Sequence, residues 1–559
     1  MSLLSITEWL PRYRRSDLRF DVIAGVTVAA LVVPKALGYA GIALIPIQNG
    51  LYAAAAGAFL YAVFGTSRQI STGPSSALAA VAASAVVTTE VLPEEAPELV
   101  AAVTLLTGFL FVVLAVLKMG WISRFLSKAV ITGFLFGAAI EVVVGELPKL
   151  AGTDASGKNA WREFIDFVST LDERHTATMV VAAVALTVIL VARFTLPKVP
   201  GALALVVGGL LASNLFDLAE RGVATVGDVP RGLPAPELPG ASVFTEHIAT
   251  IATAALALVL IGFSQTVGDA RMFATRHNYR IRVDNESIAE GVSNLGSGAL
   301  QGMPVSTSLS ASSLADSSGA RTQMASVVTG VVVVLTLLIF APLFSDLPKP
   351  VLAAIIIDAV VFGMMDVAQM RRLWRISRFD FWIALLAILG VLTAGVLAGV
   401  VIGIILSLGW LVYINAKPPL RELARRPDST TFRALDDFPD YETYDGLLII
   451  RFDGGMYFVT TEVFVDQLRD RLATADPPIE RVVIDFESVN FLDSQGASEL
   501  DRLVETAADR GVSLRFARLK SAVQPMLEAD GVIDRLGAER VHTSVNEAVN
   551  AALAERPQR

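Results

Sequence analysis

Two short segments of this chain combine hydroxyl-bearing side chains with glycine and proline in a pattern that suits anion binding. They are Ser71-Thr72-Gly73-Pro74-Ser75-Ser76-Ala77 and Gly302-Met303-Pro304-Val305-Ser306-Thr307-Ser308-Leu309-Ser310. In a hydrophobic chain this pairing predicts two broken helices whose positive N-terminal ends, at these segments, point at one another. Free N–H groups and the positive dipole at a helix N-terminus attract negative ions. The two segments therefore predict an anion site near the middle of a bilayer.

The serines in these segments also have a structural interpretation. Small hydroxyl residues let membrane helices pack closely and often cap helix starts. For Ser75, Ser76, Ser308 and Ser310, packing or capping is therefore the alternative to contact with the anion.

A lysine inside the first apolar run is a further candidate. Lys35 follows Pro34 within the run 21–44. A charged side chain in a membrane span is costly unless it faces a cavity or a partner, so by default it marks function. We expect Lys35 to attract the anion by Coulomb interaction, which is stronger in a partly desolvated pocket than in water. The alternatives are an ion pair with Glu141 or Asp269, or snorkelling toward an interface.

Acidic side chains near the predicted site are candidates for coupling to H⁺ or Na⁺. Asp269 is the first candidate and lies four residues after Gln265, so both share one helical face. Glu141, inside the apolar stretch 138–144, is the next candidate. The alternative for Asp269 is a structural place at the cytoplasmic end of its helix, near Arg271.

The composition predicts a membrane protein. Of 559 residues 53% are hydrophobic and 18% charged, with a mean hydropathy of +0.59, which excludes an ordinary soluble or a disordered chain. The absence of cysteine excludes disulfides and thiolate metal sites, and the four histidines have no metal-like spacing. No nucleophile–base pair or phosphate loop is visible, so we expect no enzyme and no cofactor beyond a coupling ion.

Eight apolar runs are long enough to cross a membrane, and the last is long enough to cross twice. If the two broken helices predicted above are counted as half-helices, the apolar runs fit fourteen membrane segments in two groups of seven. The runs lie near 21–44, 98–118, 130–147, 177–195, 201–217, 248–268, 323–344 and 380–415.

The distribution of charge predicts the orientation. Cations gather before the first span, in the turn 118–128 and in 371–378, whereas the turn 90–98 holds four glutamates and no cation. The positive-inside rule then places the N-terminus in the cytoplasm, and an even number of crossings returns the tail there. No signal peptide is predicted in the first 20 residues. We expect a multi-pass protein of the plasma (inner) membrane of a prokaryote.

A change in composition near Lys417-Pro418-Pro419 predicts a domain boundary. Residues 1–415 contain 27 Lys and Arg and 28 Asp and Glu, whereas the much shorter 416–559 contains 18 and 26. We predict a cytoplasmic segment 1–20, a transmembrane domain 21–415 and a cytoplasmic domain 416–559. The tail alternates strand-like and helical runs and is predicted to be a small α/β domain, in which Asp493 precedes a helix as its cap.

With these motifs the chain resembles the SulP (sulfate permease) family of anion transporters, to which prestin also belongs. The tail resembles that family's STAS domain. The resemblance covers nearly the whole chain and rests on Pro34–Ala40, Asn49–Tyr52, Gly65–Pro74, Asn285-Glu286, Gly302–Ser310 and Gly319–Gln323.

The resemblance implies an α-helical polytopic homodimer whose protomers have seven-plus-seven inverted repeats, divided into core and gate domains. It implies an anion held between the N-termini of the third and tenth helices and moved by an elevator-like shift of the core. Carried over by position, the site residues are Lys35, Tyr39, Ser75, Ser76, Leu309 and Ser310.

This chain departs from the family pattern at three positions. Lys35 stands where glutamine is usual, and Ala311 stands where arginine is usual. Gln265 replaces an acidic residue of many relatives, with Asp269 one turn further on. Together these differences indicate that the cation has moved to the first helix and the carboxylate along the eighth.

The leading hypothesis is secondary transport, by symport or exchange, of a small anion of the sulfate, bicarbonate or dicarboxylate class. The expected partners are this inorganic or carboxylate anion, the lipid bilayer and a second copy of the chain, with no nucleic acid. The alternatives are a passive anion (chloride) channel, a nucleobase-type permease, and a membrane-tethered regulator acting through the STAS-like tail.

Overall fold

A computed structural model describes residues 4–119, 127–154, 160–195 and 201–555. The chain forms two compact units, Met1–Ser407 and Leu408–Arg559, each of which is described by itself. The predicted boundary between residues 415 and 416 stays a prediction, and most of the turn 118–128 lies outside the described residues.

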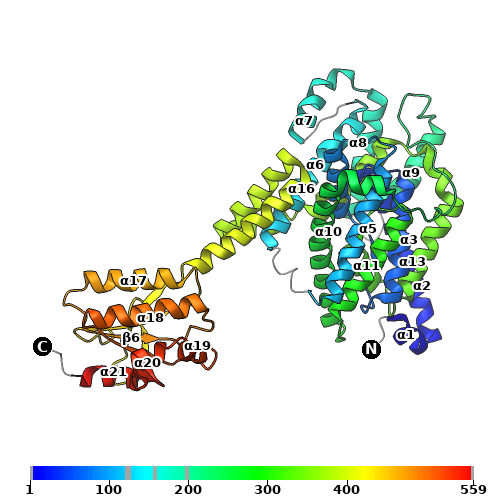
Figure 1. The fold of residues 1–559 in the computed structure, drawn as a ribbon. Helices are drawn as coiled ribbons and strands as arrows, with labels where there is room; N and C mark the ends of the chain where they lie inside the picture. Colours follow the sequence, from blue (N-terminus) through cyan, green and yellow to red (C-terminus); the bar gives the residue numbers. More distant parts are fainter. Residues whose placement is uncertain (1–3, 120–126, 155–159, 196–200, 556–559) are drawn as a thin grey trace. The chain divides into compact units, whose positions relative to one another are not determined.

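Among the described residues, the first half of the transmembrane unit contributes seven membrane segments. Figure 1 shows them within the helical bundle. A short N-terminal stretch of α1 (Ile6–Trp9) and η1 (Leu10–Arg12) precedes them. The segments and the strand between them are α2 (Arg15–Ile42), α3 (Ile47–Phe64), β1 (Thr72–Pro74) with α4 (Ser76–Thr89), α5 (Ala96–Val116), α6 (Lys128–Ala151), α8 (Thr176–Thr195) and α9 (Gly201–Leu215).

The second half repeats this order. Its last helix, α16, is bent at Gly395, whose φ of +86° breaks the helical path, so it counts as two segments. The elements are α10 (Ala241–Arg276), α11 (Val283–Ala299), β2 (Val305–Thr307) with α12 (Leu309–Ser317), α13 (Met324–Leu335) continued by η4 (Thr336–Phe340) and η5 (Ala341–Asp346), α14 (Lys349–Met364) and α16 (Arg378–Ala416).

The two halves correspond as an inverted repeat of seven segments each. In each half a short strand precedes the third segment, and an amphipathic helix follows the fifth: α7 (Ala160–Ser169) and α15 (Val367–Ile376). The packing also corresponds, because α2 packs on α12 and α13 as α10 packs on α4 and α5. The predicted fold class is confirmed. The candidate spans that contain residues 47–64 and 349–364 are not among the eight apolar runs counted in the sequence.

The helices of this unit pack in two groups. Helices α2–α5 lie against α10–α13, and helices α6, α8, α9 and α14 lie against one another. Glycine permits the closest approaches, because a Cβ on Gly108 of α5 would stand 2.7 Å from the carbonyl oxygen of Gly291 on α11. Where α6 of the second group meets α16, a Cβ on Gly133 would stand 2.3 Å from the carbonyl oxygen of Ala384. Both groups are therefore tightly packed around backbone contacts.

The second unit is an α/β domain around one mixed sheet (Figure 1). Helices α17 and α18 cover one face and α21 the other. The strand order is β4-β3-β5-β6-β7-β8, with β5 to β8 parallel. The elements are β3 (Leu420–Arg425), β4 (Phe432–Ala434), β5 (Leu447–Phe452), α17 (Thr461–Thr474), β6 (Arg481–Asp485), α18 (Ser494–Asp509), β7 (Ser513–Ala517), α19 (Gln524–Ala529), α20 (Val532–Leu536), η6 (Ala538–Arg540), β8 (Val541–His542) and α21 (Val545–Ala554).

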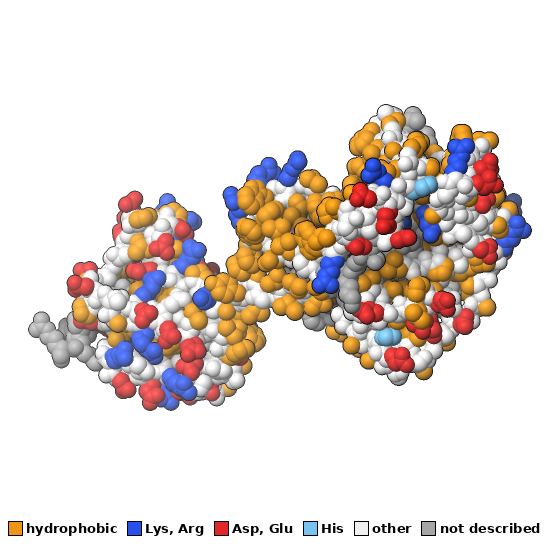
Figure 2. Space-filling view, turned by 90° about the horizontal axis from the view of Figure 1, so that it is seen from above, with side chains coloured by type: hydrophobic (Ala, Val, Ile, Leu, Met, Phe, Trp, Pro, Cys, Tyr) orange, Lys and Arg blue, Asp and Glu red, His pale blue; other side chains and the backbone are white. Residues whose placement is uncertain are grey.

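The predicted cap of α18 is present, because Asp493 accepts a hydrogen bond from the backbone N–H of Gly496 at 2.7 Å. Figure 2 shows the contrast between the two surfaces: hydrophobic side chains gather over the transmembrane unit, and acidic and basic side chains mix over the tail unit. On α8, apolar residues such as Val180 and Val184 are exposed on the surface of the protein, as expected for a helix that faces lipid.

Candidate functional site

The two glycine- and proline-containing segments lie side by side. β1 and β2 pair antiparallel, with Thr72 opposite Thr307 and Pro74 opposite Val305. Helices α4 and α12 begin immediately after these strands. Their N-caps are Ser75 and Ser308, whose hydroxyls each accept a hydrogen bond from the third N–H of the helix at 3.4 Å. Each helix start is thus built locally by a serine cap, and the strand pair holds the two starts together.

Both helix starts open on a pocket with a volume of about 480 Å³. Eight of the nine predicted site residues line it, and only Glu141 does not. The eight are Lys35, Tyr39, Ser75, Ser76, Gln265, Asp269, Leu309 and Ser310.

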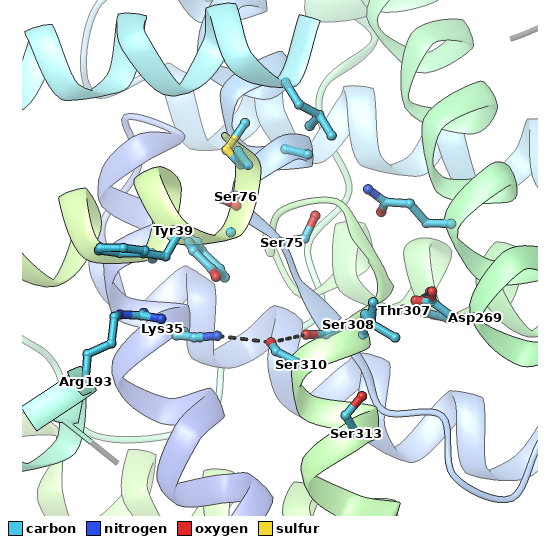
Figure 3. A pocket seen from close by; sticks show the side chains of 18 residues that line it. Lys35, Tyr39, Ser75, Ser76, Arg193, Asp269, Thr307, Ser308, Ser310 and Ser313 are labelled. Atoms are coloured by element: carbon cyan, nitrogen blue, oxygen red, sulfur yellow. Dashed lines mark hydrogen bonds between the residues drawn. The ribbon is translucent and has the colours of Figure 1, made fainter. Parts of the chain in front are cut away.

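The ammonium group of Lys35 points to the start of α12 (Figure 3). Its Nζ donates a hydrogen bond to the Ser310 hydroxyl at 3.1 Å, and the hydroxyls of Ser310 and Ser308 lie 3.3 Å apart. Among the described residues no ion pair joins Lys35 to Glu141 or Asp269. The structure therefore does not contain either of the structural ion pairs considered as alternatives for Lys35.

The carboxylate of Asp269 lies on the opposite side of the pocket from Lys35 (Figure 3). Its Oδ2 accepts a hydrogen bond from the Thr307 hydroxyl at 3.1 Å, which ties α10 to strand β2. Gln265, one turn earlier on α10, lines the same wall. Tyr39 of α2 is buried, whereas Leu309 at the start of α12 is 48% exposed. The pocket thus combines hydroxyl groups and helix N-termini with one acidic and two basic side chains.

Glu141 lies elsewhere, on α6. It is half-buried, and its Oε2 is enclosed without a hydrogen-bond partner among the described residues. Glu141 does not line the pocket. No direct contact with this site therefore supports a coupling role for Glu141.

The second basic side chain of the pocket, Arg193, was missed by the sequence interpretation. Arg193, in the last turn of α8, donates two hydrogen bonds of 2.7 Å to the carboxylate of Asp358 on α14. The guanidinium also lies 4.3 Å from the ring centre of Phe362. Arg193 and Asp358 are both charged residues within apolar runs, and this pattern could have identified them as candidate functional residues. The other lining residues outside the prediction include Thr307, Ser313 and Met364.

Comparison with known proteins identifies the family of this chain. The model of the Sulfate permease family matches residues 18–387. The chain belongs to the sulfate permease family. The STAS domain model matches residues 438–548, so this sulfate permease family member carries the family's tail domain as predicted.

Individual relatives extend over the whole chain of this family member. A probable sulfate transporter of Mycobacterium tuberculosis is 31% identical, with 96% of both chains covered. The chloroplastic sulfate transporter 4.1 of Arabidopsis thaliana is 26% identical, with 99% of this chain and 83% of the relative covered.

Solved structures show the same fold. The murine solute carrier 26 family member A9 anion transporter, in its inward-facing state, superposes with a TM-score of 0.90 over 99% of this chain and 94% of its own. The transmembrane domain of a cyanobacterium bicarbonate transporter superposes with a TM-score of 0.59 over 71% of this chain and 99% of its own. Both are 21% identical to this chain, so they establish its fold alone.

Proposed function

We propose that this protein is a secondary transporter that carries a small anion of the sulfate, bicarbonate or dicarboxylate class across a membrane. The observation that carries the proposal is the β1–β2 pair, which presents the starts of α4 and α12 to one pocket beside Lys35. The names of the related proteins support it, because they include sulfate transporters and a bicarbonate transporter.

The helix starts supply the donors for an anion. Among the described residues, the backbone N–H groups of Ser76 and Ala77 on α4, and of Leu309 and Ser310 on α12, have no acceptor. Such groups, with the helix dipoles, form a ready site for negative charge. Lys35 adds a full positive charge at the α12 side, where partial desolvation strengthens the attraction.

The position of the pocket supports an elevator-like movement. Its lining comes from both helix groups: Lys35 and Ser310 belong to the group of α2 and α12, whereas Arg193 and Phe362 belong to the group of α8 and α14. Sliding one group past the other would carry the anion site across the membrane. In this proposal the N-terminus and the STAS domain are cytoplasmic, the membrane is the plasma membrane of a prokaryote, and the working unit is a homodimer.

Asp269 is the proposed contact for a coupling ion. It faces the pocket and bonds Thr307, which belongs to the strand that leads into α12. A proton or a sodium ion at Asp269 would reduce the negative charge that an incoming anion meets. The expected result is uptake that depends on a pH or sodium gradient and weakens in Asp269→Asn.

The test is an uptake panel in proteoliposomes, in which competing anions are compared with and without sodium and pH gradients. We expect saturable uptake against a gradient, and Lys35→Ala should raise the half-saturating concentration about tenfold, a loss of roughly 1.4 kcal/mol. Lys35→Arg should retain more affinity than Lys35→Gln. Lys128→Ala, which changes a lysine outside the pocket, is the matched control. Wild-type affinity in Lys35→Ala would refute the site, and an ohmic current without gradient coupling would indicate a channel.

A further inference from the structure

A second carboxylate lies behind the pocket and takes no part in the proposed anion contacts. Glu290 of α11 is 0% exposed. Its Oε1 accepts hydrogen bonds from the hydroxyls of Thr72 on β1 at 3.1 Å and Thr266 on α10 at 3.2 Å. Its Oε2 is buried without a partner among the described residues. Burying an ionised carboxylate in this way is costly unless a cation or several donors compensate for the lost water.

Glu286, one turn earlier on the same helix, shows what full compensation requires. It is equally enclosed, yet it accepts hydrogen bonds from the Tyr61 hydroxyl at 2.5 Å, from the backbone N–H groups of Thr66 and Ser67 at 2.8 and 3.2 Å, and from the Thr66 hydroxyl. Glu290 has only two neutral donors, both at one oxygen. The carboxylate of Glu286 is therefore better compensated by hydrogen bonds than that of Glu290.

The charges around Glu290 add to this difference. The charged side chains that act on it are Glu286 on its own helix and Asp269 on α10, and both are acidic. Of the other helices that pack on α11, α3 contains no charged residue and α5 contains only Glu98, in its first turn. Among the described residues, the charged neighbours of Glu290 are thus acidic, and no cation pairs with its carboxylate.

A short path of contacts links Glu290 to the pocket. Thr72, which donates to Glu290, stands opposite Thr307 in the β1–β2 pair, and Thr307 donates to Asp269 in the pocket wall. We propose that Glu290 is the residue that binds the coupling proton, so that the anion and a proton are carried together. This inference rests on the proposed function and narrows it: where the coupling ion is a proton, the group that binds it is Glu290 in place of Asp269, which remains the contact for a sodium ion.

The coupling follows from linkage between the two sites. An anion bound at the starts of α4 and α12 adds negative charge near Glu290 and so favours its protonated form. By reciprocity, a proton on Glu290 favours anion binding by the same factor. A proton needs only the free Oε2, whereas a metal ion needs several converging ligands, and the described residues contain no group of three or more acidic or histidine side chains that could hold one.

The experiment measures labelled anion uptake and internal pH in the same proteoliposomes. In the wild type, an inward proton gradient should accelerate uptake at least tenfold, and uptake without a gradient should acidify the interior. Glu290→Gln keeps the shape and the neutral state of the side chain, so exchange of internal for external anion should continue while the acidification and the acceleration are lost. Unchanged acidification in Glu290→Gln would overturn the proposal, as would acidification that is kept in Glu290→Gln and lost in Asp269→Asn or Glu141→Gln.

Two further outcomes separate this inference from the proposed function. Anion uptake that depends on sodium and leaves the internal pH unchanged would retain the transporter and overturn the proton site. Infrared spectroscopy of the purified full chain tests Glu290 even where no anion is taken up. We expect the C=O stretch of a protonated carboxyl group at neutral pH, absent in Glu290→Gln and shifted by anion binding. A wild-type spectrum without that band would overturn the proposal whether or not the variant folds.

Discussion

In the tail unit Asp485 is completely buried, and Arg518 donates to both oxygens of its carboxylate. In the transmembrane unit Glu290 is just as buried, and Lys35 stands in the pocket, yet among the described residues neither has an ion-pair partner. The tail therefore pairs its buried charge within the protein. The transmembrane unit leaves these two side chains without a partner, and in our proposals Lys35 is open to an anion and Glu290 to a proton.

This difference separates structural charges from functional ones. Removing one partner of a buried ion pair is strongly destabilising, whereas a buried charge without a partner already costs stability in the intact protein. An unpaired charge inside a membrane domain therefore needs a reason such as substrate binding or coupling. The pair Arg193–Asp358 is the intermediate case, because its two charges are paired within the protein while Arg193 also lines the pocket.

Breaking the tail pair should give the largest effect. Asp485→Ala leaves Arg518 without its buried partner, and we expect the tail unit to lose about 3 kcal/mol of stability, as when other buried pairs lose one member. Hydrogen exchange of the backbone amides of strands β5 to β7 in the full chain measures this loss of stability. Asp466→Ala, which breaks the exposed pair with Arg469, is the control and should cost under about 1 kcal/mol. Equal effects in the two variants would contradict the comparison.

The intermediate pair should respond to a charge swap. Arg193→Ala leaves Asp358 unpaired with 12% of its side chain exposed, and we expect about 2 kcal/mol of destabilisation. The double variant Arg193→Asp with Asp358→Arg should restore thermal stability. This double variant moves the positive charge from α8 to α14. We therefore expect a changed anion affinity, although the thermal stability is that of the wild type. A double variant no more stable than the single one would show that the pairing is not what stabilises these helices.

Local signals predicted the helix starts and the tail strands, because both depend on residues that are neighbours in sequence. Glycine, proline and serine mark where α4 and α12 begin, and apolar runs mark β5 to β7. The span α3 was not recognised in the sequence because its alanine- and glycine-rich segment has a mean hydropathy of only 1.2.

The missed pair and the buried glutamate could not be predicted from neighbours in sequence. Arg193 and Asp358 are 165 positions apart, so only the fold brings them together. Glu290 lies in a short helix rich in polar residues, and its isolation depends on packing by α3, α5 and α10.

Lysines of the transmembrane unit provide a matched test of the same comparison. Lys35→Ala removes an unpaired charge, so anion affinity should fall about tenfold while thermal stability changes by under about 1 kcal/mol. Lys149 is paired at 2.7 Å with Glu146, whose side chain is 4% exposed. Lys149→Ala should therefore destabilise the unit and leave anion affinity unchanged. A reversed pattern, with Lys35→Ala the less stable variant, would assign Lys35 a structural role.

The smallest expected effect is a pH dependence in the tail. Burial, and then the positive charge of Arg515, lower the pKa of His542 below its usual value of 6.5. The neutral ring lies 3.1 Å from the Arg515 guanidinium, which can donate to it. The folded tail therefore binds fewer protons than the unfolded chain, and this contribution is complete above pH 6.5 and is lost as the pH falls. Hydrogen exchange of β7 and β8 in the full chain should show greater loosening at pH 5.5 than at pH 7.5, and His542→Gln should reduce that difference. An unchanged difference in the variant would show that another group is responsible.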